Sequence, residues 1–162
     1  MVADIEKSAS SLDRVLVLTR DFQAPRALVF EAWTDPQHLV QWWGPKDFTL
    51  PHYQQDFRVG GSYRLCMRSP EGEDHWVWGV YREIVEPERI VFTWNRDPHP
   101  EMPRAESVVS VTLAEHAGGT RLTLHHAIFQ SVRDRNEHVG GWTECLQRLG
   151  SYVETFMNRS EA

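Results

Sequence analysis

The strongest constraint on the fold is a periodic apolar pattern near the C-terminus. Apolar side chains recur there every three or four residues, at Val139, Trp142, Leu146, Leu149, Val153 and Phe156. This spacing places all six on one stripe of a long α-helix. Ser131 and Asp134 resemble a capping box before it, and Gly140-Gly141 predicts either a kink or the true start of the helix. Such a stripe needs another element to cover it.

Residues 48–127 follow a different pattern, with short β-rich segments separated by turn residues. Turn signals occur at Gly60-Gly61, Ser69–Gly72, Pro87-Glu88 and Ala117–Gly119. Their regular spacing predicts an antiparallel meander. The expected strands are Phe48–Phe57, Ser62–Arg68, His75–Val85, Arg89–Asn95, Glu106–Leu113 and Thr120–Ala127.

The segment before this meander predicts one further strand and two short helices. Val15–Phe22 is the strand, Pro25 suits the first turn of a helix, and Asp35-Pro36 starts a second helix that Gly44-Pro45 ends. We therefore predict an α+β fold in which a curved, six- to seven-stranded antiparallel sheet surrounds the long helix. One domain is expected over residues 14–158, after a flexible tail at 1–13.

Charge and composition argue against several classes of function. The net charge is −6 with no basic run, so neither a nucleic-acid surface nor a polybasic membrane patch is expected. No apolar run approaches the roughly 20 residues of a spanning helix. Residues 1–13 lack the apolar centre of a signal peptide. Cys66 and Cys145 form no CxxC pair, which predicts free buried thiols and a cytoplasmic location.

The chain carries no clear catalytic or metal-binding motif. There is no GxSxG segment, and the adjacent His125 and His126 would point to opposite faces of a strand. A site formed by His75, His126 and His138 has no motif to support it. We therefore assign no catalytic residue, metal or cofactor, and read the carboxylates Glu137 and Glu144 as a solvated helix face.

Five segments, taken in order, resemble the proteins related to the C-terminal domain of the heat-shock protein 90 ATPase activator. They span about residues 14–156 and include RDFQAPRALVFEAWTDP (20–36), QWWGP (41–45), GGSYR (60–64), GVYREIVEPERIVFTW (79–94) and GGTRLTL (118–124), with Gly141-Trp142 in the last helix. The resemblance implies the helix-grip fold of the START and polyketide-cyclase superfamily. It also implies a hydrophobic cavity between the sheet and the C-terminal helix.

Aromatic residues are numerous, with seven Trp, seven Phe and four Tyr, and they either fill this space or line it. In His75–Val85 we expect Trp76, Trp78 and Val80 to face inward. The loop with Asp97, His99 and Glu101 is a candidate lid. The predicted lining residues are Trp42, Tyr63, Leu65, Met67, Trp76, Trp78, Phe92, Trp94, Val109, Val111, Leu124, His126, His138, Trp142, Leu146 and Leu149.

Three functions remain open at this point. The first is binding of a small hydrophobic or aromatic molecule in the cavity. The second is a cyclase, dehydratase or hydrolase acting on a polyketide-like or aromatic substrate, with Tyr63, His126 and His138 as acid–base candidates. The third is a stress-related module that contacts a chaperone, although the chain lacks the separate N-terminal domain of the eukaryotic co-chaperones. A homodimer through an edge strand is a further possibility.

Overall fold

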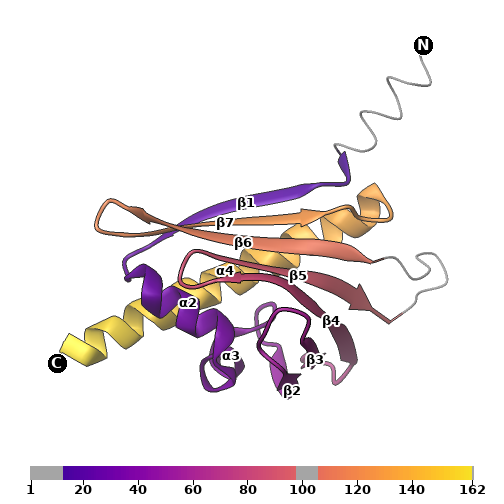
Figure 1. Cartoon of the computed structure of the whole chain (residues 1–162). Coiled ribbons are helices and arrows are strands. Elements are labelled where there is room, and N and C mark those ends of the chain that lie inside the picture. Colours follow the sequence, from indigo (N-terminus) through magenta and orange to yellow (C-terminus); the bar gives the residue numbers. More distant parts are fainter. Residues whose placement is uncertain (1–12, 98–105, 162) are drawn as a thin grey trace, which may run out of the picture.

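A computed structural model of the chain describes residues 13–97 and 106–161. Within these residues, seven strands and three helices occur in the predicted order (Figure 1), so the α+β helix-grip fold is confirmed. Residues 1–12 of the predicted tail, and His99 and Glu101 of the candidate lid, lie outside the described residues. The elements are β1 (Leu16–Phe22), α2 (Arg26–Thr34), α3 (Pro36–Trp42), β2 (Thr49–Gln55), β3 (Ser62–Arg68), β4 (Asp74–Val85), β5 (Arg89–Arg96), β6 (Ser107–His116), β7 (Gly119–Ala127) and α4 (Val132–Glu161).

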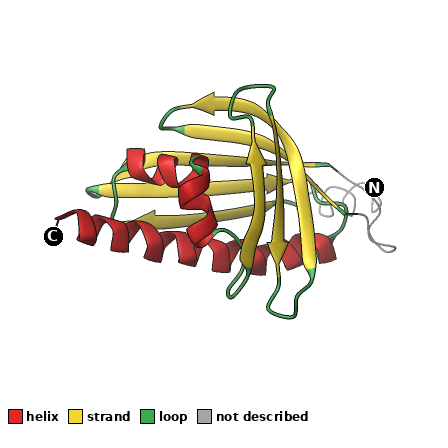
Figure 2. Ribbon diagram, turned by 90° about the horizontal axis from the view of Figure 1, so that it is seen from below, coloured by secondary structure: helices red, strands yellow, loops and turns green. Residues whose placement is uncertain are grey.

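The described strands form one antiparallel sheet with the order β1-β7-β6-β5-β4-β3-β2. Strands β2 to β7 are the predicted meander, and β1 joins it by pairing with β7 from Leu16 opposite His126 to Phe22 opposite Thr120. The sheet is strongly curved. Figure 2 shows one group of strands running roughly along the long helix and another group running across it. All three described helices lie against the same face of the sheet in this view.

Helix α4 covers the concave face with the predicted stripe. Trp142, Leu146, Leu149 and Val153 are at most 4% exposed, whereas Phe156, at the end of the stripe, is 38% exposed. Each fully buried aliphatic side chain contributes about 2 kcal/mol through the hydrophobic effect. The helix runs unbroken from Val132, so the alternative that it begins at Gly140-Gly141 is wrong. Ser131 accepts a hydrogen bond from the Asp134 amide at 3.0 Å, as an N-cap does.

The inward face that we predicted for β4 is wrong. The inner residues are Val77, Gly79 and Tyr81, because Val77 pairs with Leu65 and Gly79 with Tyr63. Trp76 and Trp78 lie on the outer face, where Trp76 stacks on His52 and Arg64. Both faces of this strand carry large apolar residues, so alternation alone does not identify the inner one.

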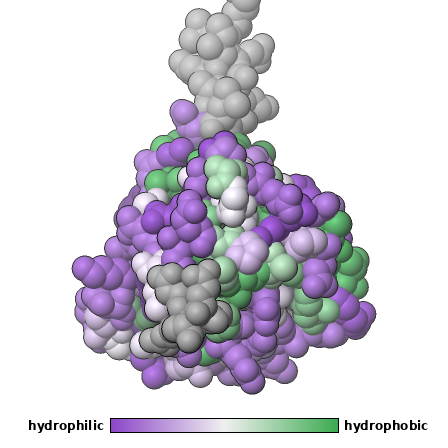
Figure 3. Space-filling model, turned by 90° about the vertical axis from the view of Figure 1, so that its left-hand side faces the viewer, coloured by the Kyte–Doolittle hydropathy of each residue, from purple (hydrophilic) through white to green (hydrophobic). Residues whose placement is uncertain are grey.

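Hydrophilic residues predominate on the face shown in Figure 3, and apolar residues appear there in smaller groups. Both cysteines are free and buried, as predicted. None of the helices in the described segments combines the length and apolarity that a membrane crossing requires.

Gly79 of β4 lies very close to the backbone of Thr93 in β5, so a substitution at Gly79 tests the described sheet. A Cβ atom at this position would lie 2.0 Å from the backbone oxygen of Thr93, which cannot move without breaking the sheet. We expect Gly79→Ala to lower the free energy of unfolding by about 3 kcal/mol in urea denaturation. Gly140→Ala is the control, because nothing lies within 4 Å of its added Cβ and alanine favours a helix. Equal stability of the two variants would contradict the described contact.

Candidate functional site

A cavity of about 410 Å³, partly open to solvent, lies at one end of the space between the sheet and α4. Its walls come from the segment 43–48 after α3, the ends of β3, β4 and β5, and the first half of α4. The rest of that space is filled by buried side chains. The lining residues are Trp43, Gly44, Pro45, Phe48, Met67, Asp74, His75, Trp76, Val77, Trp94, Arg96, Asp97, Glu137, His138, Gly141, Trp142 and Cys145.

Three indole rings form the main apolar wall. The centroid of Trp142 lies 5.6 Å from that of Trp43 and 5.3 Å from that of Trp94. The planes of Trp43 and Trp142 meet at 82°, whereas those of Trp43 and Trp94 differ by 33°. Each ring is at most 6% exposed. The wall is therefore an aromatic corner with two sides nearly at right angles.

Arg148 of α4 fixes the segment that carries Trp43. Its Nη1 atom lies 2.9 to 3.3 Å from the backbone oxygens of Trp43, Gly44, Pro45 and Phe48, so that its two N–H groups are shared among these four acceptors. Gly44 has a φ of +105°, a conformation that a side chain disfavours. This guanidinium group is the hydrogen-bond donor for carbonyl groups of the turn that would otherwise need water. It therefore holds one wall of the cavity in place.

Cys145 reinforces the same turn. Its Sγ accepts a hydrogen bond from the Gly44 amide at 3.3 Å. Burial raises the pKa of the thiol to about 12. The thiolate form that would react is therefore scarce at neutral pH.

An ion pair borders the polar side of the cavity. Arg96 donates to Oδ1 of Asp134 at 2.9 Å, and the Asp134 side chain is only 8% exposed. His138 Nδ1 donates to the backbone oxygen of Asp134 at 2.8 Å and lies 3.4 Å from its Oδ1. Burial alone would raise the pKa of Asp134, but the hydrogen bond with His138 and the charge of Arg96 outweigh it, so this pKa is lowered.

His126 is a structural residue. Nδ1 accepts from the Trp142 indole N–H at 3.1 Å, so Nε2 carries the proton and donates to Ser107 Oγ at 2.7 Å. The residue is fully buried, and burial lowers its pKa well below 6.5. A neutral ring with both nitrogens occupied holds Trp142 in place and has no site left for a metal ion. The three-histidine alternative is therefore wrong.

Tyr63 is also held inside the core. Its hydroxyl donates to the backbone oxygen of Thr93 at 2.5 Å, and burial raises its pKa well above 10. Among the three acid–base candidates, only His138 borders the cavity.

Five of the sixteen predicted lining residues border the cavity: Met67, Trp76, Trp94, His138 and Trp142, although the Trp76 ring contacts His52 and Arg64 on the outer face of β4. Trp78 lies on the outer face of β4. The other ten fill the core between sheet and helix, and they are Trp42, Tyr63, Leu65, Phe92, Val109, Val111, Leu124, His126, Leu146 and Leu149. Of the adjacent pair at the end of α3, Trp42 is the core residue and Trp43 lines the cavity.

Sequence reasoning missed the residues that give the cavity its shape. Gly141 leaves space where α4 faces the cavity, and Glu137, which we read as solvated, stands at its edge with Arg96 and Asp97. The Gly140-Gly141 pair inside a strong helical pattern is the available signal, because a glycine there is costly unless space is needed.

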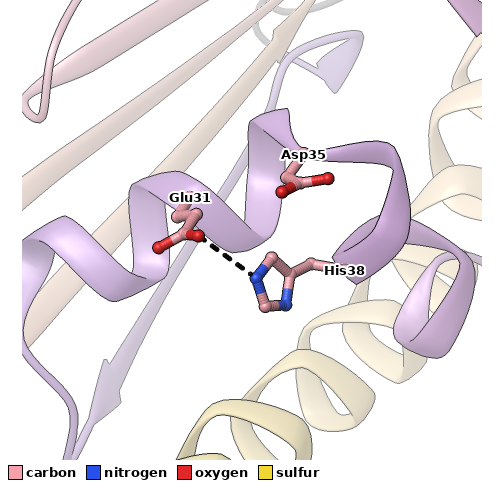
Figure 4. A group of neighbouring side chains, drawn as sticks. All are labelled: Glu31, Asp35 and His38. Atoms are coloured by element: carbon pink, nitrogen blue, oxygen red, sulfur yellow. Dashed lines mark ion pairs between the residues drawn. The ribbon is translucent and has the colours of Figure 1, made fainter.

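A second polar cluster joins α2, α3 and α4 (Figure 4). Within the described chain, three possible metal ligands come together at Glu31, Asp35 and His38, whose ligand atoms lie within 4.8 Å of one another. Each already has a partner: His38 pairs with Glu31 at 3.4 Å and with the Tyr152 hydroxyl at 2.5 Å, and Asp35 caps α3 by accepting from the Gln37 amide. These contacts explain the cluster as a link between helices.

Comparison with known proteins identifies relatives over almost the whole described fold. Residues 23–154 match the family model described as Activator of Hsp90 ATPase homolog 1-like protein. The crystal structure of protein CV1439 from Chromobacterium violaceum is similar, with 29% identity, a TM-score of 0.80, and coverage of 87% of this chain and 97% of that one. The AHSA1 protein SPO3351 from Silicibacter pomeroyi shares 29% identity with a TM-score of 0.75, covering 87% and 98%. No curated protein matches this chain.

The Arg148 contacts predict a stability loss. Arg148→Met removes the donor from four carbonyls, and we expect the free energy of unfolding to fall by about 2 kcal/mol in urea denaturation. Arg82→Met is the control, because the Arg82–Glu106 pair is exposed and contributes at most about 1 kcal/mol. If both variants lose the same stability, Arg148 does not anchor the turn.

The lowered pKa of Asp134 predicts a pH-dependent contribution to stability. Arg96, His138 and His126 are the charged or titratable groups around this carboxylate. Because its folded-state pKa is below the ordinary 3.8, the ionised group stabilises the fold above about pH 4. That contribution is lost as the pH falls through the folded-state value. The stability advantage of the wild type over Asp134→Asn, measured in urea at each pH, should shrink as the pH falls below about 4. A difference that stays constant below this pH would contradict the assigned pairing.

Proposed function

The chain belongs to the family of Activator of Hsp90 ATPase homolog 1-like proteins, and we propose that it binds a small molecule with an apolar or aromatic body. The observation that carries the proposal is the cavity beside α4. Its volume of about 410 Å³ falls in the range of roughly 300–1,000 Å³ that is usual for ligand pockets. It also combines an apolar wall with a few polar groups at the edge, which is the usual make-up of such pockets.

The walls support this proposal because they are fixed by contacts within the protein. Arg148 holds the segment with Trp43, and His126 holds the indole of Trp142. A preformed pocket needs little ordering when the ligand enters, so less of the interaction energy is lost.

Catalysis on a polyketide-like or aromatic substrate is less well supported. Acid–base chemistry needs a titratable group within hydrogen-bonding reach of the substrate. Tyr63 and His126 are sequestered in the core, which leaves His138 alone of the three candidates. The chaperone-partner and homodimer hypotheses stay predictions, which a pull-down with the heat-shock ATPase and sedimentation analysis would test.

Filling part of the cavity from α4 should weaken binding without unfolding the protein. Gly141 borders the cavity. A Cβ atom added at this position would make one ordinary contact, with Pro45 at 3.7 Å. We expect Gly141→Leu to weaken ligand binding at least about tenfold, since it occupies part of the ligand volume. Native mass spectrometry with fatty acids, sterols, neutral aromatics and amines measures the bound fraction.

Gly140→Leu is the matched control, because it adds the same side chain to the neighbouring position, where nothing lies within 4 Å of the Cβ. It should bind as the wild type does. No adduct with any compound on the wild type would refute a binding role for the cavity. Equal binding by Gly141→Leu and wild type would place the ligand elsewhere.

A further inference from the structure

The aromatic corner borders the cavity with three indole rings, each at most 6% exposed. Trp43 and Trp142 are nearly perpendicular, and Trp94 lies within 6.4 Å of both ring centroids. The face of an indole ring attracts cations more strongly than the face of any other side chain. Two or more rings set at an angle can contact one positive group from different directions.

The charged residues around the corner are mainly acidic. The lining contains the three carboxylates Asp74, Asp97 and Glu137 but one guanidinium, Arg96. Asp74 is paired with Arg68 at 2.7 Å, and Glu137 lies 3.5 Å from Arg133 on the exposed surface of α4. Asp97 directly follows β5 at the cavity edge and is exposed.

The single guanidinium is already neutralised by the protein. Arg96 donates to Asp134, whose buried carboxylate has a lowered pKa and so remains ionised at neutral pH. A ligand carboxylate at this point would compete with Asp134 and would also lie near the carboxylates of the lining, of which Asp74 and Glu137 are themselves paired with Arg68 and Arg133. Like charges at such close range disfavour an anionic ligand.

We propose that the cavity selects organic cations, meaning ligands that carry an ammonium group next to an aromatic or alkyl body. This inference rests on the proposed binding function and specifies the ligand class for the same site. The ammonium group lies against the aromatic corner and toward the acidic edge, and the apolar body fills the remaining volume. A fatty acid or an aromatic acid of similar size is a poor ligand.

Three compounds of similar size test the charge preference. Benzyltrimethylammonium is the cation, neopentylbenzene is its uncharged carbon isostere, and phenylacetate is an anion with the same ring. Binding is followed by quenching of tryptophan fluorescence and by calorimetry at pH 8. We expect the cation to bind about tenfold more tightly than the isostere. Raising the salt from 50 to 300 mM should weaken cation binding only.

Two double variants separate the effect of carboxylates at the cavity from the effect of the net charge of the protein. The double variant Asp97→Asn/Glu137→Gln removes two carboxylates from the cavity edge, whereas Asp56→Asn/Glu71→Gln removes two exposed ones outside the lining. The first should reduce cation affinity several-fold and leave the isostere unchanged, and the second should alter neither.

The outcomes distinguish this inference from the function on which it rests. Failure of all three compounds to bind, together with no adduct in native mass spectrometry, would refute the binding function itself. Equal affinity for cation and isostere, or tighter binding of phenylacetate, would overturn the charge preference while the binding function stands. Equal effects of the two double variants would assign the preference to the net charge of the protein rather than to the cavity.

Discussion

The mutual covering of α4 and the concave sheet face is the constraint on which the other features depend. The stripe from Trp142 to Val153 is buried against inward residues of the sheet, and neither surface is stable in water alone. The fit is uneven along the helix. Leu146, Leu149 and Val153 fill the middle and the C-terminal half, whereas Gly141 contributes no side chain to the first half. The cavity therefore lies beside a position where the helix carries no side chain.

Helix α4 leaves room for the cavity at Gly141, and other residues of the same helix hold two of the cavity walls in place. Arg148 lies about one turn beyond Cys145, whose Sγ accepts from the Gly44 amide, and it contacts the four carbonyls of the opposite segment. Trp142 is oriented from behind by His126 of β7. One helix thus closes the core, bounds the cavity and positions two of its walls. These contacts together make the aromatic corner rigid, and a preorganised binding site requires such rigidity.

The fold followed from periodicity and turn residues, whereas the position of the cavity did not. Six apolar residues at helical spacing predict the long helix, and turns such as Gly60-Gly61 predict where the strands end. Because each helix or strand then has one apolar face to bury, few ways of packing the elements together are possible. The inner face of β4 was misassigned because Trp76 and Trp78 are apolar yet lie on the outer face, beside Arg64. The cavity depends on a missing side chain and on contacts between residues about 100 positions apart, and periodicity carries no information on either.

An aromatic wall beside a cavity has an energetic consequence. Trp43 and Trp94 border the cavity although each is at most 6% exposed, so a small part of the dispersion contact of a filled core is missing there. A ligand that restores these contacts binds only the folded chain, and its binding free energy adds to the free energy of unfolding. The same interaction that would make the cavity selective would therefore also stabilise the pairing of α4 with the sheet. Ligand recognition and fold stability are coupled through the first half of this helix.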